Sequence, residues 1–284
     1  LDYAFIRGTF ADERGNISME RECTNLGVLA IAEAVKNCSG MVIVQVEKVV
    51  KTGTLDPRYV RIPGALVDVV VPVSDRKYHM QTFGTQYDPA LSGTSALSRR
   101  PTPLKMDIRK LIGRRCIMEL KEGTIVNLGI GLSEIVAAVA YEERIGETVT
   151  FTIEGGVTGG MVLSGMDFGA AAAPECMMDQ ASMFDFYDGG GLDEAFLGLA
   201  QCDRLGNINV SRFGSRIAGC GGFIDISQNA KKVVFCGTFT AKNLEVKAED
   251  GTLAIVREGE IDKFVNEVMQ VTFSSERARR SGQE

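Results

Sequence analysis

The sequence predicts an α/β protein built from two related open α/β domains, and three observations carry this prediction. Thirty-two glycines stand against seven prolines, and Val and Ile occur in short runs, as expected of a chain with many tight strand-to-helix turns. Strand-like apolar segments alternate with helical patterns along the 284 residues. Hydrophobic residues make up 45% of the chain, and a core of that size is usually divided between two domains.

An internal sequence repeat predicts that the two domains are copies of one unit. The motif DERGN at 12–16 returns as DRLGN at 203–207, shifted by 191 positions (203 − 12 = 191). Asn37 before one apolar strand matches Asn229 before another at nearly the same offset (229 − 37 = 192). Asp-x-x-Gly-Asn alone is only a strand-joining turn. Its repetition in register is what indicates a duplicated α/β unit.

Residues 1–73 are assigned to the end of a first domain, because three strand patterns enclose a helical one. The helical spacing of apolar residues covers Leu26–Val35. Strands are expected at Tyr3–Ile6, Met41–Val50 and Leu66–Pro72. Over 74–105 the pattern gives way to Pro, Gly and polar residues, which predicts an interdomain linker or arm.

Residues 106–284 are assigned to a second domain. Helices are expected at Met106–Leu120 and Ser133–Glu143. Strands are expected at Thr124–Leu128, Thr148–Ile153, Glu194–Gln201, Ile208–Val210, Phe223–Asp225 and Lys232–Cys236. Past Glu258 the pattern fits either a helix or a strand.

Charge and composition exclude several classes of protein. The net charge of −6 offers no electrostatic footprint for nucleic acid. No window approaches the roughly 20 apolar residues of a membrane helix, and no secretory leader opens the chain, so we expect a cytoplasmic protein without a membrane partner. The seven cysteines are widely spaced and form no C-x-x-C pair, which predicts buried or semi-buried thiols in a reducing compartment.

Charge-relay hydrolysis and metal chemistry are disfavoured. His79 is the only histidine and lies in the predicted linker, where we expect it to be solvated. Asp185, Asp188 and Asp193 are widely spaced between glycines, which favours a solvated loop over an ion site. We therefore expect no metal.

A strand running into a Gly-x-Gly turn and then a helix occurs at 126–133. Asn127, Gly129 and Gly131 belong to this turn, whose backbone N–H groups could hold an anionic group. A dinucleotide-binding fold is a more specific alternative. The third glycine of its G-x-G-x-x-G motif would fall at Glu134, however, whose carboxylate would repel a pyrophosphate. A tight turn that merely needs glycine stays open.

Glu154 follows an apolar strand and precedes Gly155 and Gly156. A charged residue at the carboxyl end of a parallel strand is where α/β proteins place their ligands, and adjacent glycines let a bulky substrate approach. An exposed turn residue is the ordinary alternative.

A third glycine cluster at 219–222 precedes the strand expected at Phe223–Asp225. Amides of Gly221 and Gly222 could form an oxyanion pocket, or the glycines could serve close backbone packing. Methionines could line an adaptable apolar pocket or fill the core. They are Met161, Met166, Met177, Met178 and Met183.

At these motifs the chain resembles the family I coenzyme A transferases, and among them the single-chain type acting on acetate, propionate or acetoacetate. The resemblance runs over essentially the whole chain and is densest at Ala4–Asn16, Asn127–Gly131, Glu154–Gly160 and Gly221–Thr238. It implies that Glu154 is the catalytic glutamate and that the glycine loops lie beside a bound thioester. The family's first domain starts with its own glycine-rich segment, so we expect this domain to be only partly present, with a further strand region after Glu284.

The resemblance further implies a ping-pong exchange through a glutamyl-CoA thioester. Coenzyme A would be a cosubstrate, without a permanently bound cofactor, and the partners would be an acyl-CoA and a short-chain carboxylate. A homodimer or homotetramer is expected. Two alternatives stay open: an acyl-CoA hydrolase using the same glutamate, and a small-molecule-binding domain without turnover.

Overall fold

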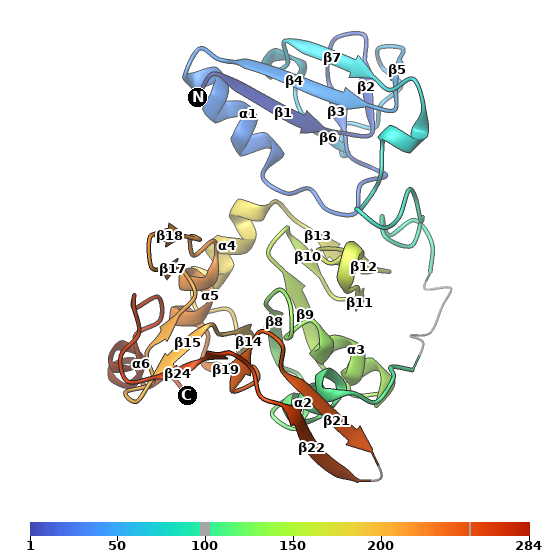
Figure 1. Ribbon diagram of the computed structural model, residues 1–284. Helices are drawn as coiled ribbons and strands as arrows, with labels where there is room; N and C mark the ends of the chain where they lie inside the picture. The colour runs from blue at the N-terminus through green and yellow to red at the C-terminus, as the bar shows by residue number, and fades with distance from the viewer. Residues whose placement is uncertain (97–102, 250) are drawn as a thin grey trace. The chain divides into compact units, whose positions relative to one another are not determined.

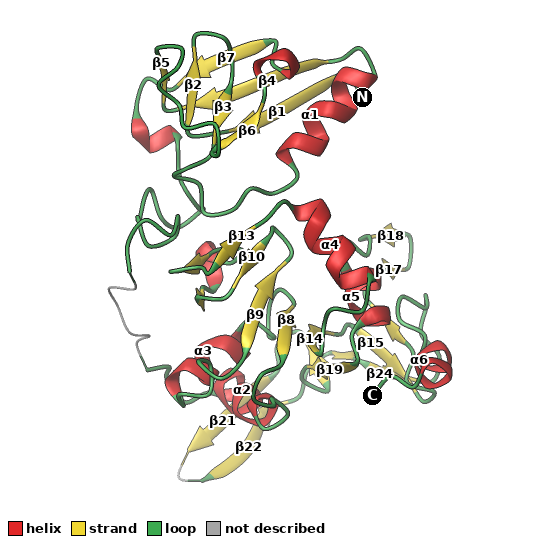
Figure 2. Ribbon diagram, turned by 180° about the vertical axis from the view of Figure 1, so that it is seen from behind, coloured by secondary structure: helices red, strands yellow, loops and turns green. Residues whose placement is uncertain are grey.

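The computed structural model describes residues 1–96, 103–249 and 251–284, and the chain divides by its internal contacts into two compact units. The first unit contains Leu1–Arg99 and Ile153–Met183; the second contains Arg100–Thr152 and Phe184–Glu284. Each unit contains both helices and strands (Figures 1 and 2), which confirms the predicted α/β class. The proposed domain division at 73 and 106 stays a prediction.

Three parallel strands in the order β1-β4-β7 organise the first unit (Figure 1). Buried and exposed residues alternate along β4 (Met41–Val46), where Val42, Val44 and Val46 are fully buried. This period of two belongs to a strand with one covered face. Helix α1 (Val28–Asn37) packs on that face and buries apolar side chains at helical spacing.

A second sheet of the first unit has the order β5-β2-β3-β6. The strands and short helices of residues 1–96, besides β4 and α1, are β1 Tyr3–Arg7, β2 Phe10–Asp12, β3 Ile17–Ser18, β5 Lys48–Val50, β6 Val60–Ile62, η1 Gly64–Leu66, β7 Val69–Pro72 and η2 Arg76–Tyr78. The later segment of this unit adds β10 Val157–Thr158, β11 Met161–Val162, η3 Gly165–Asp167, β12 Ala171–Ala172 and β13 Cys176–Met177.

The second unit contains parallel strands in the order β9-β8-β14-β19. They are β9 Thr150–Ile153, β8 Ile125–Leu128, β14 Glu194–Gly198 and β19 Lys232–Cys236. The α-helices here are α2 Ile108–Ile117, α3 Ile135–Glu142, α5 Phe223–Asn229 and α6 Ser275–Ser281, together with α4 Gln180–Asp188, whose residues up to Met183 belong to the first unit. Short strands complete the chain: β15 Gln201–Asp203, β16 Ile208–Asn209, β17 Arg212–Phe213, β18 Arg216–Ile217, β20 Thr240–Ala241, β21 Glu245–Glu249, β22 Thr252–Arg257, β23 Ile261–Asp262 and β24 Phe264–Val265.

The two turns of the internal repeat, residues 12–16 and 203–207, have the same hydrogen bonds. Asp12 Oδ1 accepts from the amides two and four residues on, at 2.9 and 3.0 Å, and Asp203 Oδ1 does so at 2.9 Å in both cases. The side-chain amide of Asn16 donates to Asp12 Oδ2 at 2.9 Å, and that of Asn207 donates to Asp203 Oδ2 at 3.0 Å. One local structure therefore occurs in both units.

Strand pairing repeats with the same offset. Tyr3 lies opposite Met41 where β1 pairs with β4, and Glu194 lies opposite Lys232 where β14 pairs with β19. Both partners are shifted by 191 positions, which supports the predicted duplication. An insertion distinguishes the second copy: β5 follows β4 after one residue, whereas β20 to β23, including the β21–β22 hairpin, separate β19 from the corresponding strand β24.

Some predicted elements were wrong. Phe223–Asp225 begins helix α5 rather than a strand, because Phe223 and Ile226 use helical spacing to face the core, and Phe223 packs on Phe235 with ring centroids 6.1 Å apart. Asp185 and Asp188 lie on helix α4, not in a loop. The run Met41–Val50 breaks at residue 47 into β4 and β5.

The cysteines also correct an expectation. Cys38 and Cys176 are exposed, so the prediction of buried or semi-buried thiols fails for these two. Cys23, Cys116 and Cys236 are buried, and the Sγ atoms of the last two lie 3.2 Å apart.

Candidate functional site

Glu154 directly follows strand β9. This strand runs parallel to β8, with Asn127 opposite Thr152, so the two strands end at the same edge of their sheet. The Glu154 side chain is half-buried. The chain thus presents a carboxylate at the carboxyl end of a buried parallel strand, as predicted.

The two glycines after Glu154 occupy positions that a side chain would not fit. Gly156 has φ +109°, and a Cβ there would lie 1.9 Å from the carbonyl oxygen of Met178. A Cβ on Gly155 would lie 2.8 Å from Thr24 Oγ1. Both positions therefore require glycine on steric grounds.

Residues before α1 hold this loop in place. The Gly155 carbonyl accepts hydrogen bonds from the hydroxyl of Thr24 and from the amide of Leu26, the latter at 3.2 Å. Met178 N donates to Gly156 O at 2.8 Å. Sequence reasoning missed Thr24 and Leu26, since no local pattern connects them with a loop about 130 positions further along.

A buried charged cluster lies beside these residues and corrects the expectation for His79, which is 4% exposed rather than solvated. Glu22 accepts from the Arg7 guanidinium at 2.7 Å, and His79 Nε2 lies 3.4 Å from Glu22 Oε1. Gln45 Nε2 lies 3.3 Å from His79 Nδ1, so both ring nitrogens have a polar neighbour. A buried carboxylate needs such partners, which is why the histidine is inside.

The pKa of Glu22 is lowered. Burial works to raise it, but the hydrogen bond from His79 and the charge and hydrogen bonds of Arg7 outweigh that effect. Glu22 is therefore ionised at neutral pH and fully engaged with its neighbours.

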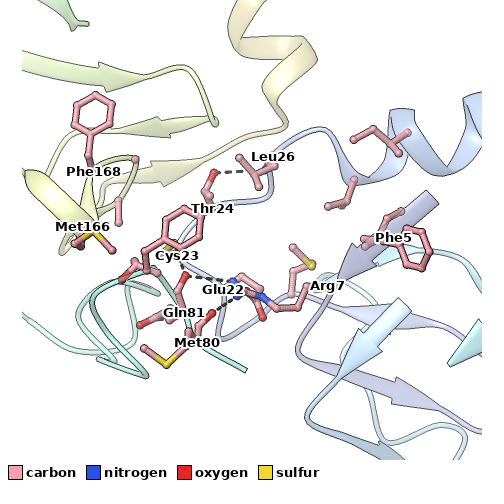
Figure 3. Close-up of a pocket in the computed structure, with 18 of the residues that line it drawn as sticks. Phe5, Arg7, Glu22, Cys23, Thr24, Leu26, Met80, Gln81, Met166 and Phe168 are labelled. Atoms are coloured by element: carbon pink, nitrogen blue, oxygen red, sulfur yellow. Dashed lines mark hydrogen bonds and ion pairs between the residues drawn. The ribbon is translucent and has the colours of Figure 1, made fainter. Parts of the chain in front are cut away.

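A cavity of about 630 Å³ opens in the first unit, lined by side chains from four segments (Figure 3). Phe5 and Arg7 come from β1, and Thr24 and Leu26 come from the loop before α1. Val28 and Ile31 of α1 add to the second segment, and further walls come from residues 78–83 and 166–170. Of the five methionines considered in the sequence, Met166 lines this cavity, whereas Met183 is fully buried in the core.

In the second unit, Asn127 lies in the core. Its side chain is fully buried and donates to Thr152 O at 3.5 Å and to the Tyr187 hydroxyl at 3.3 Å. These contacts give the side chain a structural role between strands β8 and β9 and helix α4.

Both predicted amide donors of the Gly-x-Gly turn are already used. Gly129 N donates to Phe196 O at 2.8 Å, and Gly131 N donates to the Glu134 carboxylate at 2.6 Å. Glu134 thus occupies the place at the start of α3 that a pyrophosphate would need, which supports rejecting the dinucleotide fold. The expectation of free amides at these two positions was wrong.

Gly221 and Gly222 precede helix α5, not a strand. Gly221 has φ +51° and is exposed, and Gly222 is the residue before the first helical turn. Within the described residues, neither amide donates to a protein acceptor. A Cβ on Gly222 would lie 2.5 Å from the Phe184 ring, so packing explains this glycine as well.

The predicted site residues fall into two sets. Glu154, Gly155 and Gly156 belong to the first unit; Asn127, Gly129, Gly131, Gly221 and Gly222 belong to the second. Over residues 1–96, 103–249 and 251–284, no three acidic, His or Cys side chains are placed to hold a metal ion. None of the helices in the same ranges is long and apolar enough to span a bilayer.

This fold and these motifs place the chain in the family I coenzyme A transferases. Residues 1–72 match the family described as coenzyme A transferase. The beta subunit of the acetate CoA-transferase of Escherichia coli K12 is 34% identical over 54% of this chain and 70% of its own length.

Two longer proteins are similar over the whole chain. The caffeate CoA-transferase of Acetobacterium woodii is 48% identical over 100% of this chain and 55% of its own. The crystal structure of the acyl-CoA transferase YdiF of Escherichia coli O157:H7, a thioester complex with CoA, has 41% identity and a TM-score of 0.88, covering 99% of this chain and 52% of that one. The chain therefore spans about half the length of each of these two longer proteins.

Proposed function

We propose that the protein containing this chain transfers coenzyme A from an acyl-CoA to a carboxylic acid, with Glu154 as the nucleophile. The observation that carries the proposal is the Glu154 loop. A carboxylate follows a parallel strand, and the next two positions exclude any side chain. The similarity to YdiF, whose structure is a thioester complex with CoA, supports the same proposal.

The proposed exchange has two covalent half-reactions. Glu154 attacks the acyl-CoA carbonyl, which releases the CoA thiolate and leaves an acyl-glutamyl anhydride. The thiolate then attacks the glutamyl carbonyl of the anhydride, giving a glutamyl-CoA thioester and the free acid. The acceptor acid repeats the steps in reverse, so the thioester energy is conserved and neither ATP nor a metal is needed.

Each step passes through a tetrahedral oxyanion. We propose the amides of Gly221 and Gly222 as its donors, since both N–H groups are unused by protein acceptors in the described residues. Losing one such donor slows comparable reactions by about 10²–10³-fold. Asn127, Gly129 and Gly131 remain proposals as contacts of coenzyme A, and their engaged groups favour a role in shaping the turn.

The acid that accepts CoA is the finer part of the proposal. One similar protein is named for caffeate and another for acetate, so both a bulky and a short acid have support. The seven free cysteines fit the reducing cytoplasm expected from the sequence. The homo-oligomeric state stays a prediction.

Replacement of Glu154 tests the assignment. In the intact protein, Glu154→Ala should lower transferase turnover by about 10³-fold or more with an unchanged circular dichroism spectrum. Glu154→Asp should lower it by about 10²-fold, because a shorter side chain misplaces the nucleophile. Glu147→Ala, an exposed acid in the turn before β9, is the matched control and should keep full activity. Equal turnover of Glu154→Ala and the parent would discard the assignment.

The covalent intermediate gives a second test. Protein mixed with acyl-CoA and then borohydride should contain a reduced thioester on the peptide with Glu154, detected by mass spectrometry. Release of free CoA without an acceptor acid would instead indicate a hydrolase that uses the same glutamate. Calorimetry showing CoA binding without either reaction would indicate a binding domain.

A further inference from the structure

We infer that the cavity of the first unit holds the hydrocarbon part of the acid, and that the acid is bulky and apolar, such as an arylalkanoic acid, rather than acetate. The inference rests on the proposed function and adds the substrate class to it. It revises the short-chain expectation drawn from the sequence.

The cavity is connected to the proposed nucleophile through the backbone. Thr24 and Leu26 line the cavity and also donate to the carbonyl of Gly155, the residue after Glu154. Thr24 Oγ1 would meet any side chain at position 155. The wall of the cavity is therefore built against the loop that carries the carboxylate.

Size favours a large occupant. The volume of about 630 Å³ lies within the range of about 300–1,000 Å³ that is usual for sites of small organic ligands. The methyl group of acetate would leave most of this space filled with water against apolar walls. A phenyl ring on a short chain would displace that water and gain the corresponding hydrophobic free energy.

The exposed side chains on the wall are apolar. Phe83 is 87% exposed and Met166 is 65% exposed, although both line the cavity. Large apolar side chains left open around a hollow are typical of ligand sites. Met80 lies on the same wall as Phe83, and thioethers adapt to irregular or aromatic shapes.

The walls are held by specific contacts rather than left loose. Met166 and Phe168 lie on the connection of the β11–β12 hairpin, on the side of the cavity opposite Phe5 and Arg7 (Figure 3). The hydroxyl of Thr82 donates to the Asp167 carboxylate and so links the segment with Phe83 to that connection. A framed cavity can select by shape.

The Arg7, Glu22 and Gln81 side chains of the wall are already engaged, which argues against a second charged group on the substrate. The Arg7 charge is neutralised by Glu22 at 2.7 Å, and its guanidinium also donates to the carbonyls of Met80 and Gln81. The Gln81 amide donates to Arg21 O and accepts from Asp88 N, both at 2.8 Å.

The cavity also lacks an effective nucleophile. The Cys23 thiol donates to Gln81 O at 3.3 Å. Burial raises the pKa of Cys23 to about 11, so this thiol is protonated at neutral pH and is a poor nucleophile. These walls are suited to binding an uncharged hydrocarbon and not to performing chemistry on it.

The test compares two acceptor acids, acetate and 3-phenylpropanoate, with propionyl-CoA as donor and the intact protein. The kcat/KM for 3-phenylpropanoate should exceed that for acetate by at least about tenfold, since even one methylene group distinguishes substrates by about 10–200-fold in an apolar pocket. The product acyl-CoA is measured by liquid chromatography.

Two variants test whether the cavity causes the preference for 3-phenylpropanoate over acetate. Met166→Trp fills the cavity from an exposed position and should lower the ratio of the two kcat/KM values by about tenfold. Phe83→Ala removes an aromatic contact and should lower it by about fivefold. Met118→Trp is the matched control, since Met118 is 77% exposed on the other unit and lies outside the cavity, and its ratio should not change.

The outcomes separate the two proposals. Transfer to acetate as efficient as transfer to 3-phenylpropanoate, or a ratio unmoved by both cavity variants, would overturn the substrate class and leave the transferase function standing. Absence of transfer to either acid would overturn the function itself, and the substrate class with it.

Discussion

Single residues fix the loop that presents Glu154. Gly156 combines a positive φ with a contact that excludes even a methyl group, and Gly155 is closed off by Thr24. These restrictions hold the backbone on the carboxyl side of the glutamate in one conformation. A preorganised backbone keeps a nucleophile in position without an entropic penalty during the reaction.

Replacement of Gly156 should therefore be severe. Gly156→Ala should lower the free energy of unfolding by at least about 3 kcal/mol, from backbone strain and the clash with Met178 O. Gly53→Ala is the control, because Gly53 has φ +84° but no atom within 4 Å of the added Cβ, and it should cost about 1 kcal/mol. Urea denaturation measures both, and equal losses would contradict the steric account.

Glu22 should make the chain sensitive to acid. Because its pKa is lowered in the folded chain, the ionised carboxylate stabilises the fold above the ordinary value of 4.5, and this contribution is lost as the pH falls through the lower folded pKa. Glu22→Gln should lose about 2 kcal/mol at pH 7 and show a flatter stability profile below pH 4.5. Thermal unfolding from pH 7 to 3 tests this, with the exposed Glu33→Gln as control; parallel profiles would argue against the cluster.

At the scale of elements, the duplicated turn links its hairpin to the first residue of a helical segment, η1 in one copy and α6 in the other. Asn16 Oδ1 accepts from Gly64 N at 2.9 Å, and Asn207 Oδ1 accepts from Ser275 N at 3.1 Å. The turn motif thus closes its own loop and also fastens a distant segment. This dual use explains why the same five-residue pattern serves both copies.

The two asparagines should have equivalent effects. Asn16→Ala and Asn207→Ala should each lower the free energy of unfolding by about 1–2 kcal/mol, since each removes the same pair of hydrogen bonds. Asn207→Ala also removes a hydrogen bond from the Ser275 hydroxyl at 3.3 Å, which has no counterpart at Asn16. Arg204→Ala, exposed in the middle of the second turn, should change it by less than about 0.5 kcal/mol. A large loss in one copy alone would mean that the turns are not structurally equivalent.

Across the whole molecule, the cysteines differ in how far packing shields their thiols from solvent. Cys38 and Cys176 are exposed, whereas Cys23, Cys116 and Cys236 are buried. Reactivity toward a thiol reagent follows exposure and thiolate content together.

Thiol labelling therefore reports on the native packing. With the native chain at pH 8, Cys38 and Cys176 should react first, and the buried three should react only after addition of denaturant. Cys23 should be slow for a second reason, its pKa of about 11. Peptide mapping of a labelling time course checks the order, and early modification of Cys116 or Cys236 would contradict the packing of the second unit.

The α/β class, most element positions, the duplicated turn and the Glu154-Gly155-Gly156 motif could be predicted from the residues alone, because periodicity and turn chemistry are local properties. The prediction of a strand at Phe223–Asp225 was wrong, since a short apolar run fits a strand or a helix until its neighbours are known. Four features became known from the folded chain: His79 is buried, Thr24 supports the Glu154 loop, Glu134 accepts a hydrogen bond from the Gly131 amide, and residues from four segments enclose a cavity. Each of these depends on which distant side chains meet once the chain is folded, and no local pattern in the sequence records such contacts.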